Sequence, residues 1–182
     1  MTWANTTLSA FEAAVKSSDP TPGGGTVAAV ALGQAAALLS MVADLTLDSE
    51  RWAEAHEAAQ DAKTAARNVM PVAADLADAD AHAYDEVVAA FKLQKNTEEE
   101  KEFRKNAIRA ATLGAAEVPF ETAKQACALL PHVLAMAEHG NSNAASDAGV
   151  ASLMATAAAK GAVFNVIINL NALPETMGET MR

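Results

Sequence analysis

The sequence has little of what several common folds depend on. It contains one cysteine, Cys127, only 4% aromatic residues, and essentially no alternating Val, Ile and Thr of the kind that marks strands. A single cysteine excludes an internal disulfide. Alanine makes up about a quarter of the chain, far above ordinary usage. We therefore expect an all-α fold: one domain spanning residues 1–182, built as a bundle of long, Ala-rich helices.

Basic charge is also scarce. The chain has 13 Lys and Arg against 23 Asp and Glu, a net charge of −10. Nucleic-acid binding requires clustered basic residues that neutralise phosphates, so no nucleic-acid partner is expected. The N-terminus lacks a basic segment followed by an apolar one, which favours a cytoplasmic location. The apolar run at 27–42 is shorter than the ~20 residues of a membrane span, so no membrane partner is expected.

The sequence also lacks the usual metal and nucleophile motifs. Its four histidines are scattered, and neither HExxH nor CxxC occurs. No Gly-x-Ser-x-Gly elbow is present to support a nucleophilic triad. We expect no metal site.

Helical periodicity and capping signals divide the chain. Thr97 and Glu100 form a capping-box pattern that predicts a helix start. Three prolines, Pro71, Pro119 and Pro131, are expected to kink helices or to open new ones. The predicted helices cover about 9–17, the segment after the glycines to 47, 50–70 with its continuation after Pro71, 97–116 and beyond, and 147–170.

Three consecutive glycines, Gly23, Gly24 and Gly25, lead directly into an apolar helix. They are not a phosphate loop of the Walker type, because no Lys-Ser or Lys-Thr follows and no strand precedes them. Their backbone N–H groups could face an anion or the edge of a planar ligand. They could equally form a tight loop packed on a neighbouring helix. The residues alone leave both interpretations open.

Two charged residues stand out from the solvated ones. Asp80 and Tyr84 share a helix face, and Asp80 falls beside the apolar stripe, where a carboxylate is costly to bury. Such an acid can have the altered proton affinity that acid/base catalysis uses. Lys95 precedes a helix N-terminus, where the helix dipole disfavours its charge. It is therefore either free in solvent or held for a purpose.

Polar side chains also crowd the start of the last helix. Asn141, Asn143 and Asp147 supply more polar groups than one N-cap needs. Asn165 and Asn169 then lie one turn apart inside the apolar helix itself. Buried amides require partners, so these residues form either a core network or ligand contacts.

Taken in order, these segments resemble the cyclodeaminase/cyclohydrolase family of folate enzymes. The resemblance covers most of the chain and is carried by seven pieces in series. They are PTPGGGTVAAV (20–30), SMVADLT (40–46), DAHAYDEVVAAF (80–91), KNTEEEK (95–101), AAEVPF (115–120), GNSNAASDAGV (140–150) and FNVIINL (164–170).

The resemblance implies an all-helical homodimer that binds tetrahydrofolate carrying a one-carbon unit. It implies a catalytic pair, Asp80 as general base and Lys95 as the group that passes a proton to or from nitrogen. The substrate would occupy a pocket formed by the glycine run, this pair and the turn at 141–147. The residues expected to bind it are Gly23, Gly24, Gly25, Tyr84, Arg104, Asn141, Asn143, Asp147, Asn165 and Asn169.

Two reactions occur in the family that the sequence resembles. One opens 5,10-methenyltetrahydrofolate to 10-formyltetrahydrofolate, and the other closes 5-formiminotetrahydrofolate with loss of ammonia. Because the 182 residues carry no formiminotransferase domain, we favour the methenyltetrahydrofolate cyclohydrolase and keep the formiminotetrahydrofolate cyclodeaminase as the alternative. An inactive folate-binding protein is a third possibility. Neither reaction requires a cofactor beyond the tetrahydrofolate substrate.

Overall fold

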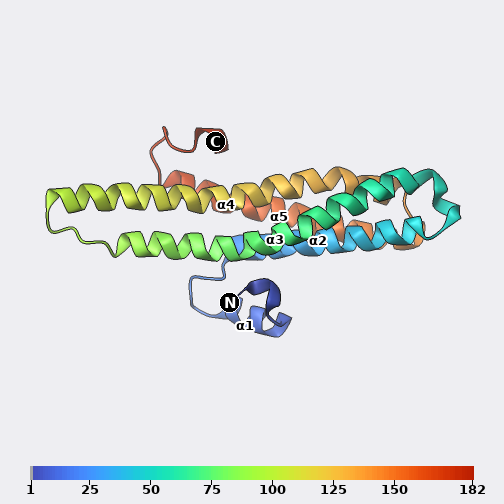
Figure 1. The fold of residues 1–182 in the computed structure, drawn as a ribbon, viewed down its shortest axis with the longest axis horizontal. Helices are drawn as coiled ribbons and strands as arrows, with labels where there is room; N and C mark the ends of the chain where they lie inside the picture. Colours follow the sequence, from blue (N-terminus) through green and yellow to red (C-terminus); the bar gives the residue numbers. More distant parts are fainter. Residues whose placement is uncertain (1) are drawn as a thin grey trace.

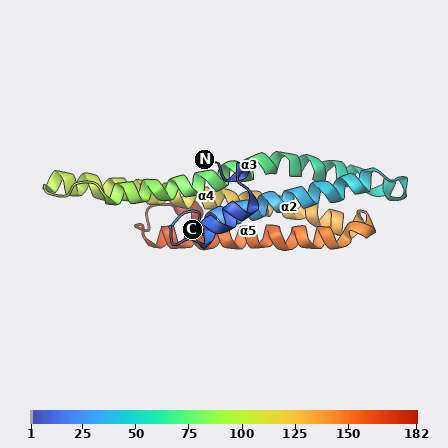
Figure 2. The same cartoon turned by 90° about the horizontal axis from the view of Figure 1, so that it is seen from below.

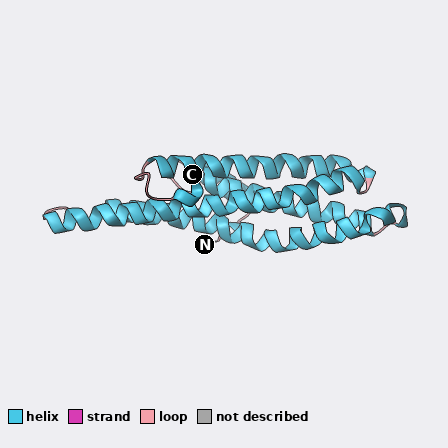
Figure 3. Cartoon of the chain, turned by 90° about the horizontal axis from the view of Figure 1, so that it is seen from above, coloured by secondary structure: helices cyan, strands magenta, loops and turns pink. Residues whose placement is uncertain are grey.

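Four long helices form an antiparallel bundle in the computed structural model, which describes residues 2–182 (Figure 1). No strand occurs among these described residues, so the predicted all-α fold is confirmed (Figure 3). The bundle consists of α2 (Gly24–Leu47), α3 (His56–Phe91), α4 (Glu98–His139) and α5 (Ala145–Asn171). The shorter elements are α1 (Leu8–Lys16) and four 3-10 turns at Trp3–Asn5, Glu50–Ala55, Ser142–Ala144 and Glu179–Met181.

Local signals in the sequence place the start of α4 correctly. Thr97 Oγ1 accepts a hydrogen bond from the backbone N–H of Glu100 at 3.1 Å. The Glu100 carboxylate in turn accepts from the backbone N–H of Thr97 at 3.2 Å. This confirms the capping box, which satisfies two N–H groups that have no partner within the helix.

The three prolines do not begin new helices. Pro71 lies inside α3, and Pro119 and Pro131 lie inside α4, both of which run through without a break. The alternative that a proline opens a fresh helix is therefore wrong. An internal proline removes one backbone hydrogen bond, but packing on both sides keeps the helix continuous.

Small side chains bring the helices close together. α2 packs against α3 and α5, and α4 packs against the same two helices. At one crossing, a Cβ atom at Gly33 of α2 would lie 3.5 Å from Cβ of Ala73 on α3. The fully buried larger side chains are few, among them Leu32, Leu39, Leu129 and Met136. Alanine fills most of the remaining core, as its abundance predicts.

Two segments are long and apolar enough to cross a bilayer by length and composition, Gly24–Leu47 and Ser142–Asn171. In the bundle, α2 buries one side against α3 and α5, with Leu32, Leu39 and Val42 fully enclosed. Half of the apolar window of Gly24–Leu47 is buried inside the protein, and a third of that of Ser142–Asn171.

The four long helices do not end at the same level. The C-terminal part of α3 and the N-terminal part of α4 form a hairpin that extends past the start of α2 and the end of α5 (Figures 1 and 2). The short helix α1 lies outside the bundle, beside α2. The base of this hairpin is where the candidate site lies.

Candidate functional site

The site is built around the N-terminus of α2. Its N-cap residue, Gly23, has no side chain to accept the free N–H groups of the first turn. A carboxylate from another helix takes that place, because Asp80 of α3 points at this turn. Thr26 Oγ1 donates to Asp80 Oδ2 at 2.9 Å. Asp80 therefore bonds to the first turn of α2, at a residue 54 positions away in the sequence.

The contact between Asp80 and α2 requires a glycine. A Cβ atom at Gly25 would lie 2.6 Å from Cγ of Asp80, a separation that real Cβ atoms do not adopt. At Gly24 the nearest atom would be Asn165 Nδ2 at 3.6 Å, an ordinary van der Waals contact. The glycine run is therefore neither a phosphate loop nor a simple turn. One glycine of the run makes room for a carboxylate.

Burial sets the electrostatics of Asp80. The pKa of its carboxyl group is raised above the ordinary value, because removal from water disfavours the charged form. The hydrogen bonds from Thr26 act in the opposite direction and are the weaker effect. A carboxylate with a raised pKa is a stronger base than a solvated one, which favours its use in proton transfer.

Thr26 was missed by the reasoning from sequence. Its side chain is fully buried, and it is the polar residue that holds Asp80 in place. The signal was present, since a hydroxyl directly follows three glycines at the start of an otherwise apolar helix. A buried hydroxyl must find a hydrogen-bond partner, and Asp80 is that partner.

Asn165 and Asn169 on α5 lie near the same end of the bundle. Asn165 Nδ2 donates to Gly161 O of its own helix at 2.9 Å and lies against Gly24. Asn169 Nδ2 donates to Ala115 O of α4 at 2.7 Å, which ties the two helices together. The structure thus places Asn165 beside the glycine run, whereas the side-chain amide of Asn169 is hydrogen-bonded to α4.

The hairpin carries three further predicted residues. Tyr84 follows Asp80 by one turn of α3 and is 42% exposed. Arg104 Nη2 and Nε donate to Phe91 O at 3.0 and 3.3 Å, and the guanidinium lies 5.5 Å from the Phe91 ring centroid. Within one chain, Arg104 of α4 therefore links the N-terminal part of α4 to the end of α3.

Lys95 lies in the turn at the tip of that hairpin, between α3 and α4. From Asp80 to the end of α3 at Phe91 the helix rises about 16 Å. A lysine has a stem of four carbons, which cannot span this distance. One chain alone does not bring together the two members of the predicted catalytic pair.

The turn at 141–147 lies at the opposite end of α2. Asn141 donates from its backbone to Thr46 Oγ1 and from its side chain to Leu45 O, both at 3.0 Å. Its Oδ1 accepts from the backbone of Asn143. Because Gly25 and Thr46 are about 31 Å apart along the helix, the expectation that Asn141, Asn143 and Asp147 line one pocket with Asp80 is wrong within a chain. Here Asn141 joins two helix ends.

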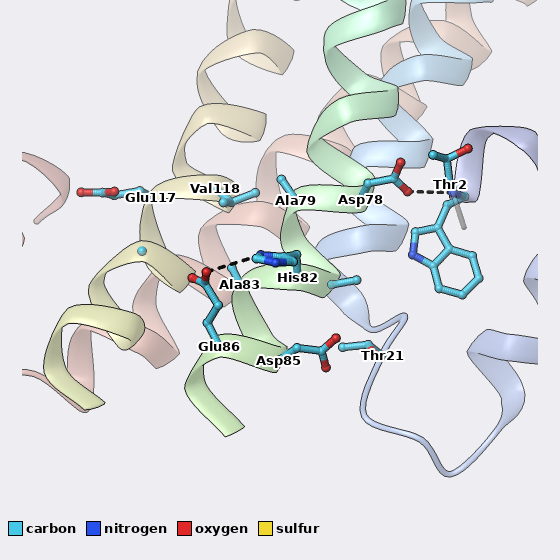
Figure 4. Close-up of a pocket in the computed structure, with 13 residues that line it drawn as sticks. Thr2, Thr21, Asp78, Ala79, His82, Ala83, Asp85, Glu86, Glu117 and Val118 are labelled. Carbon is cyan, nitrogen blue, oxygen red and sulfur yellow. Dashed lines mark hydrogen bonds and ion pairs between the residues drawn. The ribbon is translucent and has the colours of Figure 1, made fainter. Parts of the chain in front are cut away.

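A cavity of about 740 Å³ opens on the other side of α3 (Figure 4). Its acidic lining residues are Asp78, Asp85, Glu86 and Glu117, and the Trp3 backbone donates to Asp78 at 2.7 Å. Asp80 is two residues beyond Asp78 and hence roughly 200° around the helix. The cavity is therefore not the Asp80 site, and its carboxylates would repel an anionic ligand. Within residues 2–182, no three or more His, Cys, Asp or Glu side chains are arranged so that they could hold a metal ion.

Comparison with known proteins gives a consistent result. The family model described as formiminotransferase-cyclodeaminase matches residues 7–179. A methenyltetrahydrofolate cyclohydrolase of Methylorubrum extorquens is 34% identical over 171 residues, which cover 94% of this chain and 82% of that protein.

Two further similar proteins are matched over different shares of their own length. The formimidoyltransferase-cyclodeaminase of Gallus gallus is 34% identical over 95% of this chain, but the match covers only 32% of that protein. The crystal structure of a formiminotetrahydrofolate cyclodeaminase from Thermotoga maritima has a TM-score of 0.84 and 30% identity. That match covers 98% of this chain and 84% of the other.

Proposed function

The chain belongs to the formiminotransferase-cyclodeaminase family, and we propose that it is a methenyltetrahydrofolate cyclohydrolase. The observation that carries the proposal is the Asp80 carboxylate, buried against Gly25 and held by Thr26 at the start of α2. A relative of similar length bears the cyclohydrolase name, and the match covers 82% of it. The match to the vertebrate bifunctional enzyme covers about a third of that protein.

The proposed chemistry uses Asp80 as the general base. A water oxygen forms a bond to the methenyl carbon while Asp80 accepts a proton from the water. The bond from this carbon to one folate nitrogen then breaks, and that nitrogen takes up a proton as the hydroxyl becomes the formyl oxygen. One proton is released overall. The carboxylate also stabilises the cationic substrate, because it is held in a partly desolvated place.

Lys95 is proposed as the acid that protonates the departing nitrogen. An ammonium group can donate a proton and recover it from water. The pterin ring would lie against Gly24, Gly25 and Asn165, whose backbone and amide groups match the donors and acceptors of its edge. For the anionic glutamate tail we propose the basic side chains on the N-terminal half of α4, including Arg104.

Cyclodeaminase activity is the second candidate. The similar Thermotoga maritima protein carries that name and is also of comparable length. Closure of the formimino group would use the same carboxylate to stabilise the cation, with an acid that protonates the leaving ammonia. The two reactions share a tetrahedral carbon between nitrogens, so one site suits both.

We propose further that the protein is a cytoplasmic homodimer that needs no cofactor and binds neither nucleic acid nor membranes. The net charge of −10 disfavours binding to phosphate backbones. Large apolar side chains stay exposed on α5 and at the end of α3, among them Leu153, Phe164, Ile168 and Phe91. A second copy would cover such side chains.

Two rate measurements test the function. The methenyl absorbance should decay faster with protein than in buffer alone, whereas ammonia release from 5-formiminotetrahydrofolate should stay at background. The reverse result would assign the protein as a cyclodeaminase. Background rates in both assays, together with measurable binding of tetrahydrofolate, would leave a folate-binding protein and remove the enzyme proposal.

A further inference from the structure

The N-terminal helix α1 makes incomplete contact with the bundle. None of its residues is buried, although Leu8, Phe11 and Val15 form an apolar stripe along one face. Leu8 is 65% exposed and Val15 is 40% exposed. A helix of nine residues is too short to be stable in water on its own. The helix therefore depends on contacts with the rest of the protein, and in the structure its apolar face is only partly covered.

This apolar stripe faces an open cavity of about 370 Å³. The opposite wall of the cavity belongs to α2 and α5 and consists of Val27, Val30, Ala31, Gln34 and Met154. Val27 is itself 39% exposed. Two largely apolar surfaces thus line the same cavity without closing on one another. Their contact would remove both from water, which is energetically favourable.

Both ends of the segment that carries α1 are attached to elements of the Asp80 site. The Trp3 backbone N–H donates to Asp78 Oδ1 at 2.7 Å, two residues before Asp80 on α3. Within the described part of the chain, this is the only hydrogen bond that joins residues 2–19 to a long helix. At the other end, residues 17–23 are not helical and lead directly into α2. Between these attachments α1 lies outside the bundle (Figures 1 and 2).

The opposite wall of the cavity is continuous with the turn that holds Asp80. Val27 directly follows Thr26, and its backbone N–H donates to Gly23 O at 3.0 Å in the first turn of α2. This turn has no side-chain cap at its N-cap residue, and helix ends fray where packing is weak. Val27 is roughly 200° around the helix from Gly25. Contact with α1 would therefore restrain the turn from the side that faces away from Asp80.

We propose that α1 is a cover that closes on Val27 and Val30 and thereby holds the first turn of α2 in place. The structure shows the cover open. Closure seats Leu8 and Val15 in the cavity, and the non-helical residues 17–23 absorb the change in backbone angles, as hinge segments do. The effect of closure on turnover rests on the proposed function, because it acts through Asp80. Its effect on the turn does not depend on that function.

Amide hydrogen exchange of the full chain tests the cover. The double variant Leu8→Ser/Val15→Ser removes two side chains of the stripe and should speed exchange in residues 24–30 several-fold. The matched control is Ala10→Ser/Ala13→Ser, at exposed positions of α1 that do not line the cavity. The control lowers helix propensity at least as much but keeps the stripe, so exchange in residues 24–30 should match the wild type. Equal exchange there in both double variants would overturn the proposal.

A variant that fills the cavity gives the opposite test. Val27→Ile adds one methylene group to the α2 wall and keeps a β-branched side chain, so the local helix propensity changes little. The larger apolar surface should favour the closed cover and slow amide exchange in residues 8–16. Exchange in α1 that is unchanged or faster in Val27→Ile would contradict closure at this wall.

Turnover separates the cover from the proposed function. With 5,10-methenyltetrahydrofolate, kcat should fall several-fold in Leu8→Ser/Val15→Ser and stay at the wild-type value in Ala10→Ser/Ala13→Ser. Faster exchange in residues 24–30 with unchanged kcat would overturn the link between the cover and catalysis. If the wild-type protein has no turnover on either folate substrate, the proposed function fails, and the two exchange experiments still decide whether α1 restrains the turn.

Discussion

The carboxylate of Asp80 fills the space beside Gly25 that any other residue would need for its Cβ atom. This relationship connects a glycine run with an acidic residue on another helix, and it explains why both types are present. Asp80 lies close to the α2 backbone only because Gly25 has no side chain. The same proximity supplies the burial that raises the pKa of Asp80 and the Thr26 hydrogen bonding that partly offsets this rise.

Gly25→Ala should reduce turnover more than it reduces the stability of the fold. The new methyl group displaces the end of a side chain, so Asp80 can rotate away, but it then loses its bond to Thr26. We expect a loss of about 10²-fold or more in kcat, as for a misplaced catalytic base. Gly33→Ala, further along the same helix, is the control, because its Cβ would make only an ordinary contact with Ala73, and alanine favours a helix by about 1 kcal/mol. Equal kcat in the two variants would contradict the role of Gly25.

Asp80→Asn should abolish turnover and stabilise the fold at neutral pH. The folded-state pKa of Asp80 is raised, so its contribution to stability is fully present below the unfolded pKa of about 3.9 and is lost as pH rises through the folded pKa. Asparagine avoids that loss. Urea unfolding from pH 4 to 8 should show an advantage of the variant that grows with pH. Asp85→Asn, which is exposed, should show no such growth.

Thr26→Val should shift the acid limb of the pH–rate profile to higher pH. The hydrogen bonds from Thr26 lower the pKa of Asp80, and removing the hydroxyl therefore raises it further. Thr26→Ser keeps the hydroxyl and should restore the wild-type profile. An unchanged limb in Thr26→Val would show that Asp80 is not the group whose ionisation the profile reports.

Asn141→Ala should reduce stability and leave KM for the folate substrate unchanged. Its side chain bonds to Leu45 O and to the Asn143 backbone, and truncation removes both bonds at a cost of about 1–3 kcal/mol. Asn143→Ala should be milder, since Asn143 contributes its backbone N–H. A rise in KM for Asn141→Ala at unchanged stability would instead place this turn at the substrate.

Much of the fold could be predicted because its causes are local. Strand-free periodicity, alanine content and the capping box at Thr97 gave the helices and the start of α4. The prolines were ambiguous, because whether a helix continues through Pro71 depends on the packing around it. Asp80 could be singled out since a carboxylate beside an apolar stripe is costly wherever the chain folds.

The sequence by itself determined the helices, the family resemblance and Asp80 as the unusual acid, because these depend on neighbours within a few residues. Only the tertiary structure decided which residues meet. It placed Asp80 against Gly25 and Thr26, moved the Asn141 turn about 31 Å away along α2, and left Lys95 on a projecting hairpin. Such contacts join segments that are tens of residues apart, and they depend on the lengths of several helices and on how these helices pack against one another. No pattern within a few residues of the sequence determines those contacts.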